Sequence, residues 1–471
     1  MSWKEVAYNR RGTLTILCAI LALSSIWSFI SVMRYDAFNA DVLDLGVNSS
    51  LLYGVFHPDF SSGNLAVNKL IYLLIAPFYN LYPDPRTLLV FQSFWISIGA
   101  FPLYKIGKKV LGDEFASVAM SLAYLVYFPL GGVYWFDFHY MALFPTFFLF
   151  GIMFLVYERK RYLLLFMFLA TLTDLLVPII MLFMGVCYML YPSKRKRDPL
   201  ITRYILVALL FSFAVLVLIA LYFGPAYIYN WMNRPFSAGF FSSLSADLPL
   251  KAEYFFWLLL PVLFLSFLEI RILLLIIPYV LFVFSYSYHP FYSPMFYQYP
   301  ALTAPIIFTS AVYGMRKFKK IPSFRRLKAK HLAAAILLIN ILLASLLSPL
   351  GNIATGINDG YNAPNQITVT NQDNALNQMI SLIPKGSTVL IQGNMPQLTN
   401  GYHWILPYQL NHTDLPQYAL SDPYSYYYFD GVHISGNVIS NFQSEFQSLL
   451  NSGRYHIVDN EYNITLIEKN S

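Results

Sequence analysis

The residues best suited to chemistry form a short acidic stretch that directly follows the first long apolar segment. Three carboxylates fall within nine residues there, Asp36, Asp41 and Asp44. Charged residues make up only 12% of the chain, so a cluster beside an apolar segment is informative. Acidic residues at membrane depth often mark ion, proton or substrate sites. A solvated acidic loop explains the same stretch, and the residue types alone leave both interpretations open.

Other polar residues interrupt apolar surroundings further along the chain. A charge at membrane depth costs several kcal/mol, so such side chains normally face a cavity or a partner. Each also has a simpler explanation, because Asp174 could cap a helix turn and the remaining residues could lie in solvated or interfacial loops. These residues are Asp137, His139, Asp174, His289, Gln298 and Tyr299.

The composition identifies a membrane protein that crosses the bilayer several times. The chain is 57% hydrophobic and 18% aromatic, whereas a soluble domain carries about 25% charged residues. The two cysteines form neither a disulfide framework nor a zinc spacing. We find no phosphate-binding loop, dinucleotide fingerprint or nucleophile elbow. Residues 350–471 carry a net charge of −6 and the remainder +13, which suggests two environments rather than nucleic-acid binding.

The distribution of lysine and arginine predicts the topology. A polar N-terminus with Lys4, Arg10 and Arg11 precedes an uncleaved first span, so we place the N-terminus in the cytoplasm. Three lysines follow the span at 87–104, and they face the cytoplasm if residues 67–82 form an interfacial helix rather than a span. Glu269 and Arg271 predict a tight inner turn. The eleven expected spans are 13–33, 87–104, 113–130, 141–157, two within 162–191, 201–223, 253–268, 271–287, 300–314 and 331–349.

The predicted fold is an all-α polytopic bundle with a small α/β domain. The bundle covers residues 1–349, including a first outer loop at 34–66, and the domain covers 350–471. Apolar periodicity predicts helices at 374–383 and 442–450 and strands at 388–391 and 455–458. The glycosylation sequons at Asn48, Asn411 and Asn463 all fall on segments predicted to be extracytoplasmic.

Several short motifs, taken in order, resemble known membrane enzymes. Asp44-Leu45-Gly46, then Asn68-Lys69 to Pro77, then the span ending in Leu103–Gly112 are similar to the GT-C superfamily of lipid-linked glycosyltransferases. Over nearly the whole chain, the closer resemblance is to the predicted-membrane-protein family numbered 2079 among the domains of unknown function. That resemblance rests on Asp44-Leu45-Gly46, Phe136-Asp137-Phe138-His139, Asp174, Tyr299 with Pro305, and Pro384–Val389.

The chain departs from that family at three places. The family usually has His-Phe at the position of Asn68-Lys69 and Lys-Glu-Asp at the position of Leu172-Thr173-Asp174. It tends to have His-Tyr where this chain has Gln298-Tyr299. The resemblance therefore implies either an altered substrate or a member that has lost activity.

The GT-C resemblance implies sugar transfer from a polyprenyl or dolichyl phosphate at the extracytoplasmic face. An outer-loop carboxylate is then the general base, for which we select Asp44, and the leaving phosphate is held by cations or by a divalent metal such as Mg²⁺ or Mn²⁺. We expect Asp44, Asp137, His139 and Asp174 to meet in one cavity open to lipid. The alternatives are an inactive scaffold and a transporter, although the sequence shows no paired halves with broken helices. The expected substrate-binding residues are Arg34, Asp36, Asp41, Lys69, Asp137, His139, Asp174 and Tyr299, with Arg86 as a further cation.

Overall fold

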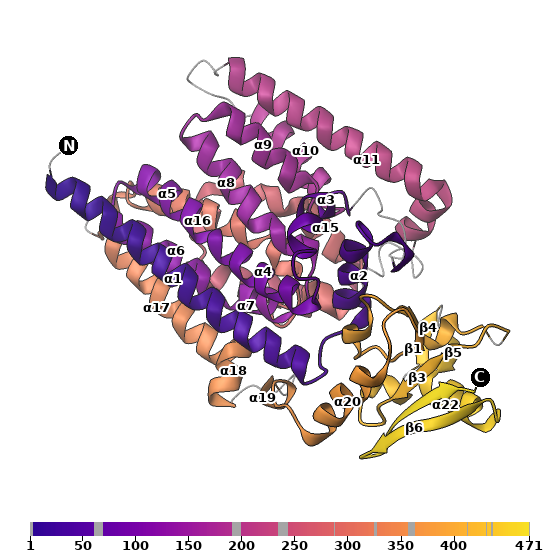
Figure 1. Cartoon of the computed structure of the whole chain (residues 1–471). Coiled ribbons are helices and arrows are strands. Elements are labelled where there is room, and N and C mark those ends of the chain that lie inside the picture. Colours follow the sequence, from indigo (N-terminus) through magenta and orange to yellow (C-terminus); the bar gives the residue numbers. More distant parts are fainter. Residues whose placement is uncertain are drawn as a thin grey trace. The chain divides into compact units, whose positions relative to one another are not determined.

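The chain forms two compact units in a computed structural model (Figure 1). The helical unit comprises residues 1–28, 66–71 and 91–363, and the α/β unit comprises 29–65, 72–90 and 364–471. Helices α1 (Trp3–Asp36) and α4 (Pro85–Ile98) contribute to both. The structure describes residues 3–60, 69–190, 199–233, 244–286, 288–324, 327–356, 363–411, 413–429, 431–434 and 437–470. The basic cluster Lys194–Arg197 lies outside them.

The helical unit is a bundle of mostly apolar helices. Helix α11 (Pro199–Asn233) bends at Gly224, whose φ of 75° is in the left-handed region that favours glycine. The other helices of this unit are α5 (Ala100–Leu111), α6 (Glu114–Leu125), α7 (Phe128–Trp135), α8 (Phe144–Val156), α9 (Lys160–Thr171), α10 (Val177–Leu190), α13 (Leu248–Leu259), α14 (Ile270–Leu273), α15 (Ile277–Ser285), α16 (Ala304–Phe318), α17 (Ala329–Leu347) and α18 (Pro349–Thr355).

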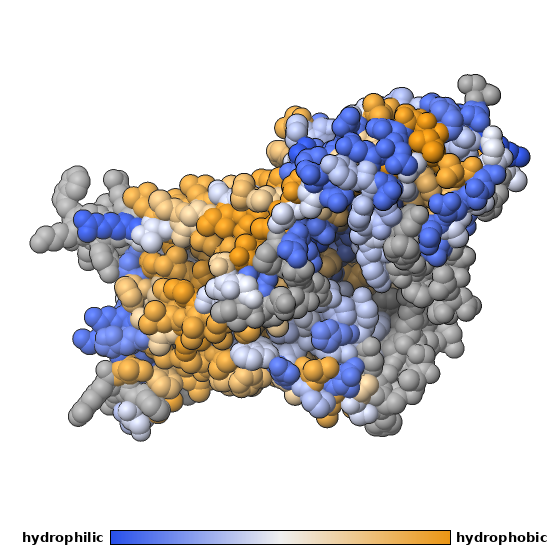
Figure 2. Space-filling view, turned by 90° about the horizontal axis from the view of Figure 1, so that it is seen from below, coloured by the Kyte–Doolittle hydropathy of each residue, from blue (hydrophilic) through white to orange (hydrophobic). Residues whose placement is uncertain are grey.

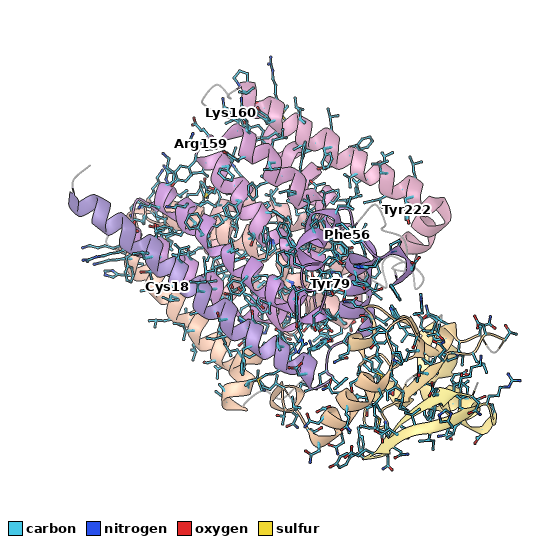
Figure 3. All side chains as sticks on the ribbon, in the orientation of Figure 1. Cys18, Phe56, Tyr79, Arg159, Lys160 and Tyr222 are labelled. Carbon is cyan, nitrogen blue, oxygen red and sulfur yellow. The ribbon has the colours of Figure 1, made fainter. Side chains whose placement is uncertain are left out.

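Apolar side chains on the surface of this unit require a lipid environment. The most apolar window of α11 is only 17% buried inside the protein, and Tyr222 on this helix is exposed (Figure 3). Figure 2 shows apolar residues covering much of one face of the helical unit. Basic Arg159 and Lys160 lie at the start of α9 (Figure 3). The structure therefore supports a multi-pass membrane protein.

The long apolar helices support five spans within the described residues: Arg11–Asp36, Pro85–Leu111, Pro199–Tyr222, Leu265–Ser285 and Ala329–Leu347. The pair α6 and α7, bent by 45°, would make a sixth. Two shorter apolar helices, Tyr140–Val156 and Val177–Met189, fall below this length. The expected eleven spans stay a prediction, because many helices here are shorter than the ~20 residues that cross a bilayer.

The turn expected at Glu269 and Arg271 was misplaced. Both residues lie inside the continuous run of short helices from Leu265 to Ser285. The chain turns earlier, at Leu263 and Phe264, where φ is 52° and 55°. Glu269 instead pairs with Lys317 of α16 at 2.8 Å. An ion pair between the buried Glu269 and the exposed Lys317 thus explains a charge that had suggested a loop.

The α/β unit contains a mixed five-stranded sheet in the order β2-β1-β3-β7-β6. Strand β1 is parallel to β2 and β3, and β7 is antiparallel to β3 and β6. A separate hairpin joins β4 and β5. The strands are β1 (Thr388–Leu390), β2 (His403–Ile405), β3 (Tyr418–Ser421), β4 (Gly431–Ile434), β5 (Asn437–Asn441), β6 (Tyr455–Glu461) and β7 (Ile464–Lys469).

Two helices cover the two faces of this sheet. Successive residues of a strand point to opposite faces, so Val389 joins the core beneath α20 (Asn371–Leu382) and Leu390 the core beneath α22 (Phe442–Asn451). A capping box between Thr370 and Asp373 begins α20. The helices and strands expected in the C-terminal part are therefore present.

The α/β unit also takes in the first loop of the chain. Phe38 and Val42 are buried in the same core as α20, and the Val42 N–H donates to the Gly393 carbonyl at 2.7 Å. This loop forms the π-helical turn η1 (Val42–Gly46), α2 (Val47–Gly54) and the 3₁₀ turn η2 (Pro58–Phe60); the unit further contains α3 (Tyr72–Tyr79), α19 (Ala363–Gln366) and α21 (Tyr426–Phe429). The boundary of the C-terminal domain is thus not a single point in the sequence.

Candidate functional site

A cavity of about 290 Å³ lies in the helical unit where several interhelical turns meet. Four of the polar residues singled out in the sequence line it: His139, Asp174, Gln298 and Tyr299. The rest of the lining is mostly aromatic or aliphatic: Tyr140, Met141, Leu175, Leu176, Phe282, Tyr286 and Phe291. A mostly apolar wall with a few convergent polar groups is the usual form of a small-molecule site.

Gln92 of α4 positions His139. Its Nε2 donates to the carbonyls of Val133 and Phe136 at 3.0 and 2.9 Å, and its Oε1 accepts the His139 N–H at 3.0 Å. Only 1% of Gln92 is exposed, and these bonds use both of its N–H donors and one lone pair of its carbonyl oxygen. The sequence did contain a signal for Gln92, because an amide inside an apolar span needs partners, but we did not select it.

Asp174 lies in the turn between α9 and α10. Its Oδ1 accepts the Leu176 N–H at 2.8 Å, so the carboxylate does help to begin α10. The Thr173 hydroxyl bonds back to the Ala170 carbonyl at 2.6 Å and closes the end of α9. Capping occupies one carboxylate oxygen of a residue that also lines the cavity. The capping and site interpretations are therefore compatible.

Gln298 and Tyr299 are held by close packing behind them. A Cβ on Gly132 of α7 would lie 2.6 Å from the Phe296 nitrogen, so only glycine permits this approach. The Tyr299 ring meets Phe291 edge to face, with centroids 4.8 Å apart. These contacts keep the segment that carries both residues against α7.

The polar groups in the cavity have shifted acidities. Burial raises the pKa of Asp174 from 3.8 to about 7, against a smaller lowering by the Leu176 N–H bond. Burial lowers the pKa of His139 from 6.5 to about 4, and the charge of Lys69 lowers it further. Lys69 lies with its Nζ 5.9 Å from the centroid of the Tyr140 ring. At neutral pH the cavity therefore combines a neutral imidazole, a partly ionised carboxyl group and a nearby cation.

Two buried polar atoms of the cavity residues lack a hydrogen-bond partner among the described residues. These atoms are His139 Nδ1 and Gln298 Oε1. Buried polar groups are normally satisfied, so a polar ligand that donates to Gln298 and bonds to the imidazole would remove both deficits. Groups with pKa values near or below neutrality can also accept or return a proton.

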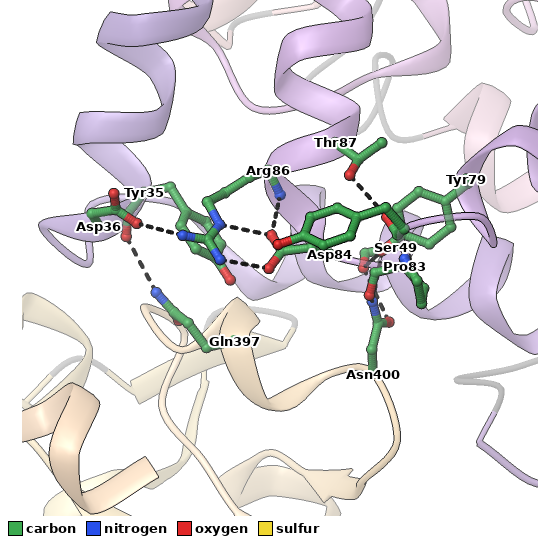
Figure 4. A network of polar contacts seen from close by, with 11 residues as sticks. Tyr35, Asp36, Ser49, Tyr79, Pro83, Asp84, Arg86, Thr87, Gln397 and Asn400 are labelled. Atoms are coloured by element: carbon green, nitrogen blue, oxygen red, sulfur yellow. Dashed lines mark hydrogen bonds and ion pairs between the residues drawn. The ribbon is translucent and has the colours of Figure 1, made fainter. Parts of the chain in front are cut away.

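The first acidic residue of the opening stretch belongs to an ion-pair network in the α/β unit (Figure 4). Arg86 binds Asp84 in a bidentate manner at 2.9 and 2.7 Å, and its Nη1 lies 3.5 Å from Asp36 Oδ1. The guanidinium also lies 5.6 Å from the centroid of the Tyr35 ring. Arg86 and Asp36, both considered for substrate binding, thus have protein partners.

The other two carboxylates of this stretch, Asp41 and Asp44, have different surroundings. Asp41 caps η1, because its Oδ1 accepts the Leu43 N–H at 2.6 Å, and its Oδ2 accepts the Tyr427 hydroxyl. Asp44 lies half-buried within η1. The glycine of the Asp44-Leu45-Gly46 motif is required by packing, since a Cβ on Gly46 would lie 2.8 Å from Thr399 Cγ2.

A second polar network in the same unit had no signal in the sequence (Figure 4). Asn400 donates to the Tyr79 hydroxyl at 2.6 Å and to the Pro83 carbonyl at 2.9 Å. Ser49 donates to Asn400 Oδ1 at 3.1 Å and shares a 2.7 Å bond with Tyr79. Its members come from α2, α3 and the loop after β1, so only the tertiary fold brings them together.

The remaining selected residues have mixed positions. Asp137 is 1% exposed and does not line the cavity. Arg34 is half-buried in the last turn of α1. Asp44 belongs to the α/β unit, and its meeting with the cavity residues stays a prediction. Among the residues that the structure describes, no group of three or more His, Cys, Asp or Glu side chains could hold a metal ion.

Comparison with known proteins gives one family. The sequence profile of a family described as "Predicted membrane protein (DUF2079)" matches residues 68–466. No curated protein matches the chain.

Proposed function

The chain belongs to the predicted-membrane-protein family DUF2079, and from this premise we propose that it is an integral membrane glycosyltransferase of the GT-C type. The donor is a sugar on polyprenyl or dolichyl phosphate, and transfer takes place on the extracytoplasmic face. The observation that carries the proposal is the cavity with His139, Asp174, Gln298 and Tyr299 in an apolar helical unit. A mostly apolar cavity with a few polar groups, within a membrane bundle, suits a substrate whose lipid tail stays in the bilayer.

The proposed reaction is a displacement at the anomeric carbon of the sugar. The acceptor oxygen forms a bond to that carbon as its bond to the phosphate oxygen breaks, and the lipid phosphate leaves with the electron pair. Asp44 takes the proton of the acceptor hydroxyl. Arg34 and Lys69 are the cations proposed to stabilise the leaving phosphate. Asp36, Asp41, Asp137, His139, Asp174 and Tyr299 stay proposed substrate contacts, although Asp36 and Asp41 also have structural partners.

The activity is tested with the full chain in lipid nanodiscs. Radiolabelled polyprenyl-phosphate hexoses are supplied with the membrane extract of the source cells as acceptor, and the lipid phosphate released is counted. We expect Asp44→Asn to abolish release, because the substitution keeps the size and removes the base. Glu461→Gln, an exposed position on β6, is the matched control. Equal turnover by Asp44→Asn and the wild type would exclude the assigned role.

The pKa of about 7 for Asp174 favours one other function, proton-coupled transport. A carboxyl group that titrates near neutrality in a membrane bundle can carry a proton. Proteoliposomes with an internal pH dye distinguish the two functions. A proton flux that requires Asp174, with no release of lipid phosphate from any donor, would replace the transferase by a carrier.

The transferase also requires the proposed topology, with a cytoplasmic N-terminus, eleven spans and an extracytoplasmic C-terminal part. Single cysteines are introduced in a Cys18→Ala, Cys187→Ala background, since native Cys18 is exposed on α1 (Figure 3). We expect a membrane-impermeant maleimide to label Ser381→Cys on α20 in intact cells and to label Arg159→Cys only after lysis. Labelling of both from the same side would refute this topology.

A further inference from the structure

A second cavity, of about 230 Å³, lies within the α/β unit and has no part in the proposed transfer. One side comes from η2, with Asp59 and Phe60. The other comes from β2 and the segment that follows it, including His403, Trp404 and Asp414. Strand β2 is the last strand at its edge of the sheet, so its outer side is not covered by another strand of that sheet.

Four aromatic rings are among the residues that line this cavity: Phe60, Tyr402, His403 and Trp404. Phe60 and His403 stack with centroids 4.9 Å apart and planes 28° from parallel. Trp404 is partly exposed, while Tyr402 is 4% exposed and packs in the core. The face of an aromatic ring carries negative potential and attracts the slightly positive edges of other groups. The C–H faces of a sugar ring present such edges.

The polar residues of the cavity are acidic or neutral. Asp59 and Asp414 are both exposed, and no lysine or arginine is among the described residues that line the cavity. Thr388 and Gln409 are fixed by bonds to the backbone, since their side-chain oxygens accept the N–H groups of Gln417 and Leu406 at 2.9 Å. Two carboxylates without a lining cation repel an anionic ligand and accept hydrogen bonds from hydroxyl groups.

From these features we propose that the cavity is a binding site for a neutral carbohydrate. One sugar ring stacks on the aromatic wall, and its hydroxyl groups donate to Asp59 and Asp414. The two exposed carboxylates disfavour the phosphate end of a lipid-linked donor, although Lys385 lies with its Nζ 4.0 Å from the centroid of the Tyr402 ring. The lining residues differ from those of the cavity in the helical unit, so the two sites are different. Carbohydrate binding here does not depend on whether the chain transfers sugar.

The test uses the full chain in nanodiscs prepared without glycoside detergents, which would compete. Saturation-transfer NMR measures binding of three neutral disaccharides: lactose, mannobiose and chitobiose. We expect at least one to bind the wild type, and its affinity to fall tenfold or more in Asp59→Asn and in Asp414→Asn. The loss of one hydrogen bond to a charged group is enough to account for a change of this size. Both positions are exposed, so the substitutions should preserve the fold.

Glu461→Gln removes the same charge from β6 of the same unit and should leave the affinity unchanged. The proposal is overturned if none of the three disaccharides shows saturation transfer, or if both aspartate variants bind as tightly as the wild type. Spermidine is tested in parallel. If it binds through Asp59 and Asp414 and no disaccharide does, the site recognises cations and the carbohydrate proposal is wrong.

Discussion

Substitution of Asp174 by asparagine should change how the stability of the protein depends on pH. The pKa of Asp174 is about 7 in the folded chain, against an ordinary value of 3.8. At 1.36 kcal/mol for each pKa unit, the buried charge costs up to ~4 kcal/mol once the carboxyl group is fully ionised. The amide introduced by Asp174→Asn would keep an oxygen that can accept the Leu176 N–H, so the turn before α10 is preserved while the charge is removed.

The direction of this pH dependence follows from how tightly the folded and unfolded states bind the proton of Asp174. Because the folded pKa lies above the unfolded one, the folded state holds the proton more tightly between about pH 4 and pH 7. The folded state is therefore most stable below the ordinary pKa of 3.8, and this stability is lost as the pH rises through the folded pKa of about 7. His139 has the opposite shift, but it is present in both proteins and its effect cancels in their difference.

The assay is thermal unfolding of both proteins in nanodiscs from pH 4 to pH 9. We expect similar melting temperatures near pH 4. The Asp174→Asn variant should become progressively more stable than the wild type as the pH rises, with the difference levelling off above about pH 8. Melting temperatures that change in parallel over the whole range would show that the ionised Asp174 bears no burial cost, and would remove the basis for its role in the cavity.

Two other substitutions test the polar networks by stability. Gln92→Leu leaves buried backbone groups around His139 unsatisfied, so we expect the free energy of unfolding to fall by about 3 kcal/mol. Thermal unfolding measures this loss, and Gln447→Leu at an exposed position of α22 is the control. A loss below about 0.5 kcal/mol, the smallest net value of one hydrogen bond, would contradict the positioning role. Asn400→Leu breaks the hydrogen bonds to Tyr79, Pro83 and Ser49. We expect the free energy of unfolding to fall by ~2 kcal/mol in the same assay. Asn451→Leu, at the exposed end of α22, is its control, and equal unfolding of the two variants would refute that estimate.

Local patterns in the sequence predicted much of the secondary structure. The helices near 374–383 and 442–450 carry apolar residues at helical spacing, and the first also has its capping residues close by. Such signals lie within a few residues of one another, so they can be read directly. The number of spans was harder to predict, because apolar helices such as Tyr140–Val156 and Val177–Met189 are shorter than the ~20 residues by which a span is recognised.

The candidate site could likewise be predicted from the sequence only in part. Asp174 and His139 interrupt apolar segments, which indicated that each needs a partner or a cavity, and the structure places both in one. The partners of the opening carboxylates were beyond such reasoning. Asp36 lies beside Arg86, and Asp41 bonds to Tyr427, 386 residues away, so neither pairing leaves a local pattern.

The burial of Phe38 and Val42 in the core of the C-terminal sheet has a consequence for biosynthesis. Val42 leaves the ribosome about 350 residues before Gly393, to which it bonds. At ~5–20 residues per second, the first loop waits of the order of tens of seconds for the strands that complete its core. A chain terminated before β1 would leave these apolar residues uncovered, which is the kind of surface that chaperones and quality-control proteases recognise. Completion of the sheet would cover this surface, because Phe38 and Val42 are buried in the same core as β1 and β7.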